Sequence, residues 1–343
     1  MPQSYLQYLL DKGCALRLPV SGTMELTGRC NLSCRMCYIH QAAQDAAVVG
    51  RELETAQWLH LARQLQAAGT LTLLLTGGEP MLRQDFDEIY TRCKRLGFLL
   101  SVNTNATLLT PARFELLRQN RPLILNVSLY GASEETYFRL CGVRGLYVRV
   151  RANLLELRRL EIPVKLNYTV TAENFPEREA IFAFARENGI PIQQTTYLFP
   201  PVRALCGGAG YGADALAARL RSRQDAQPET CGENKMHCRA GVSSFWITYD
   251  GALQACGMLP APALNLRELP FAEAWARLKA GRDAIRLPGK CLLCAERARC
   301  EVCAAVCCAE GGFDEPPDYI CRKTARYGAL CEAFLQERPD AME

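Results

Sequence analysis

The chain has 343 residues, of which 49% are hydrophobic and 22% are charged, a composition typical of a globular protein. Its formal net charge of +4 is mild and no block of lysine or arginine concentrates it, so we expect no nucleic-acid or membrane partner. No apolar run reaches the length of about 18 residues that crosses a bilayer, and the N-terminus has no signal-peptide pattern. These features predict a cytoplasmic protein.

The cysteine content is unusual. The chain has 18 cysteines and three histidines. Clustered thiols in a reducing compartment indicate metal binding rather than disulfides. Ligand sets made mainly of thiolates suit iron–sulfur clusters or structural zinc, and the spacing of the cysteines has to distinguish the two.

From residue 23 to residue 200, short β-rich runs alternate with helical patterns. Six such units in series predict an α/β fold with a parallel sheet, either doubly wound or curled into a partial (β/α)6 barrel of the TIM type. In both cases the chemistry is expected at the carboxyl ends of the strands. The predicted strands are 23–27, 70–76, 98–103, 123–129, 164–170 and 192–199, and the predicted helices are 54–68, 84–96, 111–119, 147–160 and 176–188.

The composition then divides the rest of the chain. Residues 1–20 form an N-terminal segment before the α/β unit of residues 21–200. Residues 201–230 contain CGGAGYG and a polar stretch, which predict a linker or lid. Residues 231–343 are rich in cysteine and are expected to form a small separate domain, with a hairpin at 244–255 that turns on Asp250 and Gly251.

The first cysteine motif, CNLSCRMCY, comes directly after the first predicted strand. The thiolates of Cys30, Cys34 and Cys37 can bind three irons of a 4Fe–4S cluster and leave the fourth iron without a protein ligand. A zinc site would need a fourth ligand close by, and His40 is the only candidate. The pattern therefore favours a cluster with one open iron.

This motif, with Tyr38 after its last cysteine, resembles the signature of radical S-adenosylmethionine (SAM) enzymes. The resemblance implies that SAM binds the open iron and is cleaved by one-electron reduction to a 5′-deoxyadenosyl radical, which abstracts a substrate hydrogen. Residues 76–80 (TGGEP) resemble the motif that receives the SAM amino group, and residues 101–109 resemble a strand ending in TNG, with Ala106 in place of glycine. Residues 127–142 resemble the segment that holds the SAM ribose and carboxylate. The implied cofactor site consists of Tyr38, Gly77, Gly78, Glu79, Pro80, Asn103, Asn105, Ser128, Arg139 and Asn167; for Asn167, an ordinary strand-end role is equally open.

The C-terminal cysteines form a second pattern. Residues 291–303 read CxxCxxxxxCxxC, which alone could be a zinc ribbon. Because it follows Cys238, Gly251 and Cys256 in order, it resembles the SPASM extension of radical SAM enzymes, which holds two auxiliary 4Fe–4S clusters. The resemblance implies Cys231, Cys238, Cys256 and Cys303 as ligands of one auxiliary cluster and Cys291, Cys294, Cys300 and Cys321 as ligands of the other. Cys307 and Cys308 are close enough in sequence to compete with Cys303, and that choice stays open.

The resemblance also implies a substrate class. SPASM enzymes act mostly on peptides or proteins, which favours a thioether or carbon–carbon crosslink in a ribosomally made peptide. Formylglycine-forming relatives have an aspartate after the cysteine equivalent to Cys256, and Gly257 at that position disfavours sulfatase maturation. The alternatives are a sulfatase-type maturase that forms formylglycine, a small-molecule radical SAM oxidoreductase, an iron–sulfur electron carrier and a zinc-stabilised interaction module. Candidate substrate-facing residues are Asp250, Tyr197 and Arg203, although the hairpin turn alone explains Asp250.

Three partners are expected. The first is the peptide or protein substrate. The second is a separate leader-peptide-binding protein, because the barrel begins about twenty residues into the chain and leaves no room for a domain of ordinary size. The third is reduced flavodoxin or ferredoxin as the electron donor.

Overall fold

A computed structural model describes residues 4–39, 41–195, 198–199, 238–259, 261–282, 285–298, 300, 302–311 and 313–325. Cys231, Tyr197, Arg203 and His40, which the sequence analysis singled out, lie outside the described residues.

One curved sheet organises the fold. Its nine strands follow the order β11-β10-β9-β1-β4-β5-β6-β7-β8, and the neighbours from β1 to β8 are parallel. The strands are β1 (Ser21–Thr27), β4 (Thr72–Gly77), β5 (Leu99–Thr104), β6 (Ile124–Ser128), β7 (Val164–Thr169), β8 (Ile192–Thr195), β9 (Ser244–Ile247), β10 (Ala252–Gln254) and β11 (Ala263–Asn265). The α/β prediction and its six parallel strands are confirmed, with strand starts that differ from the predicted ones by at most two residues.

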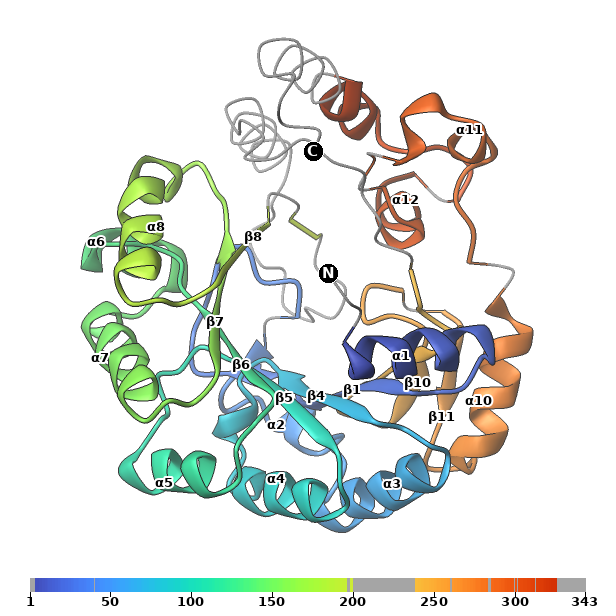
Figure 1. Ribbon diagram of the computed structural model, residues 1–343, viewed down its shortest axis with the longest axis horizontal. Coiled ribbons are helices and arrows are strands. Elements are labelled where there is room, and N and C mark those ends of the chain that lie inside the picture. Colours follow the sequence, from blue (N-terminus) through green and yellow to red (C-terminus); the bar gives the residue numbers. More distant parts are fainter. Residues whose placement is uncertain are drawn as a thin grey trace.

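Helices cover the convex side of this sheet (Figure 1). They are α3 (Thr55–Ala67), α4 (Phe86–Arg95), α5 (Pro111–Gln119), α7 (Leu146–Arg159) and α8 (Arg178–Glu187). All five were predicted from their apolar periodicity. The sequence analysis missed α1 (Tyr5–Ala15) and α6 (Glu134–Cys141). The other helices are α2 (Ala46–Val49), α10 (Phe271–Ala280), α11 (Gly289–Leu292), α12 (Ala304–Gly311), η1 (Pro80–Leu82), η2 (Phe175–Glu177) and η4 (Ala295–Ala298).

The strands alternate between an apolar face and a polar face. Leu125 and Val127 of β6 are fully buried in the core beneath the helices, whereas Asn126 and Ser128, which alternate with them, are half-buried on the opposite, concave side. The strand β7 repeats this pattern. A strand with this period buries one face and leaves the other for polar contacts. The concave side is therefore the polar side of the sheet.

The predicted hairpin is confirmed, and it belongs to the same sheet. Strand β9 pairs in parallel with β1 and antiparallel with β10. Gly251 turns the hairpin with φ +90°, a conformation that favours glycine. The cysteine-rich C-terminal segment is thus joined to the barrel through strand pairing.

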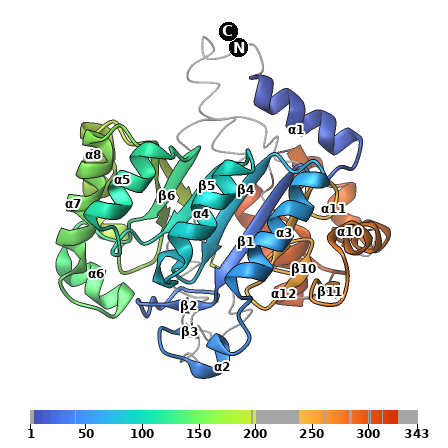
Figure 2. The ribbon, with the colours of Figure 1, turned by 90° about the horizontal axis from the view of Figure 1, so that it is seen from below.

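The two ends of the sheet differ (Figure 2). The short pair β2 (Arg29–Cys30) and β3 (Gln41–Ala42) lies with α2 at the carboxyl end of β1, and α1 lies at the opposite end. Within the described residues, no helix combines the length and the hydropathy needed to span a bilayer.

Candidate functional site

The first cysteine motif forms a loop at the carboxyl end of β1. Its intervening apolar residues Leu32 and Met36 are buried in the core, which fixes the path of the loop. The amide of Cys37 donates to the carbonyl of Cys34 at 3.0 Å. The thiols of Cys30, Cys34 and Cys37 interact electrostatically with one another. The fold therefore gathers the three predicted cluster cysteines at the edge where chemistry was expected.

Helix α6 holds this loop from one side. The amides of Ser33 and Arg35 donate to the carbonyls of Cys141 and Leu140, both at 2.9 Å. Tyr137, on the same helix, is fully buried, and its hydroxyl has no hydrogen-bond partner in the described part of the chain. Tyr137 lies close enough to Cys34 to interact with it electrostatically. Buried hydroxyl groups are nearly always hydrogen-bonded. The Tyr137 hydroxyl therefore marks a place beside Cys34 for a polar group that the described chain does not supply.

Two glycines let the end of β4 approach this loop. A Cβ on Gly77 would lie 2.3 Å from the carbonyl oxygen of Thr27, and one on Gly78 would lie 2.3 Å from that of Arg29. In their place, the amides of Gly78 and Glu79 donate to those same two carbonyls at 2.9 Å. The GGEP segment thus fixes the backbone immediately before Cys30.

Glu79 joins two strand ends. Its carboxylate accepts hydrogen bonds from the amide of Met81 at 3.0 Å, the amide of Asn105 at 2.7 Å and the hydroxyl of Thr104 at 3.0 Å. Burial raises its pKa to about 7, and these donors oppose that rise. Pro80 follows as the first residue of η1. The carboxylate therefore holds the carboxyl ends of β4 and β5 together.

Asn105 contacts the cysteine loop itself. Its Nδ2 donates to Oδ1 of Asn31 at 2.9 Å and lies 3.7 Å from Sγ of Cys30. Asn31 in turn donates to the hydroxyl of Thr107 at 2.8 Å. Ala106, between Asn105 and Thr107, has φ +58°. This left-handed conformation favours glycine, which explains why glycine is usual at this position of the TNG motif. Asn105 thus orients the loop around Cys30.

Ser128 and Asn167 lie side by side on the concave face. They are in register on β6 and β7, and Gln193 of β8 is in register with Asn167. Asn103 lies one level lower, where it donates to Thr76. Arg139 is exposed, and its hydrogen bond goes to Thr136 at 3.3 Å rather than to Ser128. Tyr38 packs near Phe199, with ring centroids 6.5 Å apart.

A buried ion-pair network braces the start of the loop. Arg29 and Arg83 both contact the carboxylate of Glu52, whose side chain is 7% exposed. Arg83 also pairs with Asp85 at 2.6 Å and donates to the carbonyl of Leu26 at 3.1 Å. The network links the ends of β1 and β2 to η1. The sequence analysis missed it, because its members are far apart in the chain.

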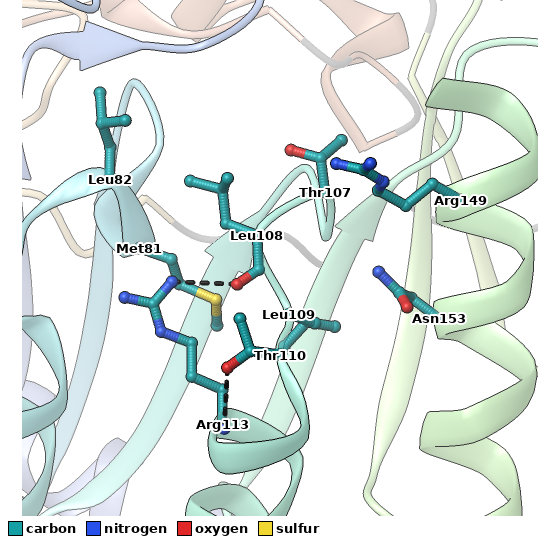
Figure 3. Close-up of a pocket in the computed structure, with 9 residues that line it drawn as sticks. All are labelled: Met81, Leu82, Thr107, Leu108, Leu109, Thr110, Arg113, Arg149 and Asn153. Atoms are coloured by element: carbon teal, nitrogen blue, oxygen red, sulfur yellow. Dashed lines mark hydrogen bonds between the residues drawn. The ribbon is translucent and has the colours of Figure 1, made fainter. Parts of the chain in front are cut away.

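A pocket of about 510 Å³ lies on the rim between η1, α7 and the loop after β5 (Figure 3). Arg149 and Asn153 project into it from α7, and Arg113 turns its guanidinium to the carbonyl of Leu108 at 3.0 Å. Thr107 in its wall is the residue bonded to Asn31. One hydrogen bond therefore links the wall of this pocket to the cysteine loop.

The C-terminal cysteines fall into two neighbourhoods. Cys291 interacts electrostatically with Cys294, Cys300 and Cys321, while Cys303 interacts with Cys238. Cys307 is fully buried near Cys291 and Cys303, and burial raises its pKa to about 12. Cys256 follows the hairpin, and its sulfur accepts from the amide of Met258 at 3.5 Å.

The donor chemistry of the first loop fits an iron–sulfur cluster. Burial raises the pKa of Cys37 to about 12 and raises that of Cys30 further, so these thiols need a bound cation to become thiolates. Within the described ranges, no three histidine, cysteine, aspartate or glutamate side chains converge on the position of a single metal ion. A 4Fe–4S cube takes each thiolate on a different iron, so its ligands surround a cluster rather than one point.

A family model described as the radical SAM superfamily matches residues 24–200. The AdoMet-dependent heme synthase of Methanosarcina barkeri is 30% identical, and the match covers 87% of this chain and 95% of that protein. The PqqA peptide cyclase of Gluconobacter oxydans is 30% identical over 68% of this chain and 62% of that protein. Streptococcus suis SuiB bound to S-adenosylmethionine has a TM-score of 0.67 at 18% identity, covering 92% of this chain and 80% of that one, and it has also been solved with its precursor peptide SuiA.

Proposed function

The chain belongs to the radical SAM superfamily, and on that premise we propose that it modifies a peptide. The family uses a 4Fe–4S cluster and SAM, which together supply a carbon-centred radical that removes a hydrogen atom from the substrate. The reaction proposed is a thioether or carbon–carbon crosslink in a ribosomally made peptide. The support from relatives is the similarity to a PqqA peptide cyclase and the fold shared with SuiB, which binds a precursor peptide.

The observation that carries the proposal is the position of the cysteine loop at the carboxyl edge of a sheet whose concave side is polar. Cys30, Cys34 and Cys37 are the proposed ligands of the cluster. Asn105 would direct its amide at the sulfur of Cys30, and hydrogen bonds to cluster sulfurs tune reduction potential. The buried Tyr137 hydroxyl, which has no hydrogen-bond partner among the described residues, supports the presence of a bound polar group beside Cys34.

The residues proposed to receive SAM surround this loop. Gly77 and Gly78 shape the backbone that would meet its amino group, and Ser128 with Asn167 offers polar side chains on the neighbouring strands. Glu79, Pro80 and Asn103 have structural contacts of their own: Glu79 holds the amide of Asn105, Pro80 begins η1, and Asn103 donates to the hydroxyl of Thr76. In this proposal they shape the SAM site rather than contact SAM. Arg139 would have to leave Thr136 to reach a carboxylate.

We place two auxiliary 4Fe–4S clusters in residues 231–343. The grouping of Cys291, Cys294, Cys300 and Cys321 supports one of them. The nearness of Cys303 to Cys238 supports the other, to which Cys231 and Cys256 would contribute. In the same proposal residues 21–200 form the barrel, residues 1–20 precede it and residues 201–230 connect the two parts.

The proposed partners are a separate protein that presents the peptide and reduced flavodoxin or ferredoxin, which supplies the electron. The proposed compartment is the cytoplasm, because eighteen cysteines kept as thiols fit its reducing conditions. If the purified enzyme modified its full-length precursor at full rate without any second protein, the presenting partner would be excluded.

The test is anaerobic iron and sulfide content after reconstitution, together with 5′-deoxyadenosine formation under reductant. Wild type should hold about twelve irons per chain, and the Cys30/Cys34/Cys37 triple alanine variant about eight, with nucleoside formation abolished. About four irons in wild type would remove the auxiliary clusters from the proposal. Zinc without nucleoside formation would overturn the enzyme assignment.

A second candidate is the modification of a haem precursor. One observation favours it: the match to the AdoMet-dependent heme synthase extends over 95% of that protein. Radical chemistry on a tetrapyrrole would use the same cluster loop and the same concave face. In the first candidate the concave face binds a peptide, and in the second it binds a tetrapyrrole. Measuring the binding of both kinds of molecule to the reconstituted enzyme distinguishes the two.

A further inference from the structure

A second row of polar side chains crosses the concave face one level below Ser128 and Asn167. Asn103 of β5 is in register with Asn126 of β6, and Asn126 is in register with Lys165 of β7. Residues in register on parallel neighbours point to the same side of the sheet. All three are half-buried, whereas the residues that alternate with them are buried in the core. The row therefore belongs to the polar, concave side of the sheet.

The hydrogen bonds along this row leave one acceptor unused. Asn126 donates through Nδ2 to Oδ1 of Asn103 at 2.9 Å, and Asn103 donates to Oγ1 of Thr76 at 3.3 Å. The Oδ1 atom of Asn126 is buried and has no hydrogen-bond partner among the described residues. Buried amide oxygens in native proteins are nearly always bonded. This oxygen is thus an unsatisfied acceptor, which an N–H or O–H group of a bound molecule would satisfy once the side chains that shield it make room.

Lys165 carries a positive charge into the same row. Its Nζ lies 2.6 Å from Oε1 of Gln193, an uncharged amide. In the part of the chain that the structure describes, Lys165 forms no ion pair with a carboxylate. Partial burial lowers the pKa of this amine, a cost that an anionic partner would offset. Gln193 is in register with Asn167, so the ammonium group of Lys165 lies close to Ser128 and Asn167, which are proposed to bind SAM.

We propose that Lys165 and Asn126 anchor the substrate, with Lys165 binding a carboxylate and Asn126 Oδ1 accepting a hydrogen bond from an adjacent N–H or O–H. The inference rests on the proposed function and names its substrate class: a molecule with a carboxylate close to the carbon that loses hydrogen. A glutamate or aspartate side chain of a peptide has this chemistry. A carboxylate-bearing tetrapyrrole has it too, so the test must distinguish the two sources.

The test uses the reconstituted enzyme with SAM under anaerobic conditions and two kinds of probe. Acetyl-Ala-Glu-Ala-amide is compared with acetyl-Ala-Gln-Ala-amide by saturation-transfer NMR, and coproporphyrin III binding is followed by fluorescence anisotropy. The variants are Lys165→Met, Lys165→Arg and Asn126→Ala. The matched control is Lys94→Met, because Lys94 donates to the backbone carbonyl of Arg121 on the convex side. Iron content and thermal unfolding establish that each variant has folded.

For a peptide enzyme, wild type and Lys94→Met should prefer the glutamate peptide by about tenfold, as expected of one charge-assisted hydrogen bond. Lys165→Met should lose this preference and Lys165→Arg should keep it, while Asn126→Ala should weaken binding of both peptides. Coproporphyrin binding that depends on Lys165, without binding of either peptide, would support the anchor and overturn the peptide proposal. Absence of any carboxylate preference in wild type, or equal losses in Lys165→Met and Lys94→Met, would overturn the anchor itself.

Discussion

Both carboxylate oxygens of Glu52 accept a hydrogen bond from Arg29, with Nε 2.9 Å from Oε1 and Nη2 2.9 Å from Oε2. Arg83 adds a third contact, with Nη1 3.3 Å from Oε2. Arg29 directly precedes the first cysteine of the loop. One carboxylate therefore determines where the loop leaves β1.

Replacing Glu52 with alanine should lower the free energy of unfolding by about 3 kcal/mol, because it removes the only carboxylate with which the half-buried Arg29 pairs among the described residues, while the buried Arg83 keeps Asp85. Guanidinium-induced unfolding of the reconstituted protein measures this loss. The control is Glu156→Ala, which removes an exposed pair with Arg159 and should cost less than about 1 kcal/mol. Equal losses in the two variants would contradict the bracing role of Glu52.

The stability of the protein should fall as the pH rises towards neutrality, through Glu79. Burial raises the pKa of this carboxyl from 4.5 to about 7, so the folded state binds the proton more tightly than the unfolded state does. The resulting stabilisation is complete below pH 4.5 and is lost as the pH rises through about 7.

Glu79→Gln should abolish this dependence. Relative to the variant, wild type should lose roughly 3 kcal/mol of unfolding free energy between pH 4 and pH 8. Urea unfolding of both proteins across this range gives the difference directly, and the subtraction cancels the titration of all other groups. Parallel curves for the two proteins would show that Glu79 has an ordinary pKa.

Gly257 should tolerate no side chain. A Cβ at this position would lie 2.6 Å from the ring of Trp246, whose Nε1 donates to Oε2 of Glu25 at 2.8 Å. Gly257→Ala should therefore cost about 1–3 kcal/mol through overpacking. Gly289→Ala is the matched control, because a Cβ there meets no atom within 4 Å. Thermal unfolding should separate the two, and similar melting temperatures would mean that the indole moves aside easily.

The choice between Cys303 and Cys307 as a cluster ligand can be decided by iron content. Cys303→Ser should lower the iron by about four atoms per chain, whereas Cys307→Ala should keep about twelve. The reason is that Cys303 interacts with Cys238, a proposed ligand of the same cluster. Cys307 is fully buried against Cys291, which is assigned to the other cluster. The opposite result would assign the ligand to Cys307.

Local patterns predicted much of the fold. The periodicity of apolar residues located the six parallel strands and five helices. Each element buries one face, and the apolar residues of that face recur in its sequence with the period of a strand or a helix. The spacing of Cys30, Cys34 and Cys37 located the cysteine loop for a similar reason. Three cysteines within eight residues are close in space whatever the rest of the fold is.

Contacts between distant segments could not be predicted in this way. The Glu52 network, the pairing of β9 with β1 and the row through Asn126 and Lys165 each join residues from separate elements. Their local signals are those of ordinary strand or loop residues. The register of the sheet, which brings Asn126 beside Lys165, depends on packing of the whole barrel.

The pairing of β9 with β1 also constrains how the molecule folds. Strand β1 lies between β4 and β9 in the sheet, and Ser21 pairs with Ser244. During synthesis, β1 therefore presents an unsatisfied edge until the ribosome has passed the hairpin. Closing so long a loop slows folding, and an exposed strand edge invites association with other chains. Protein production should accordingly improve at a low rate of expression, which keeps the concentration of unfinished chains low while the edge of β1 is exposed.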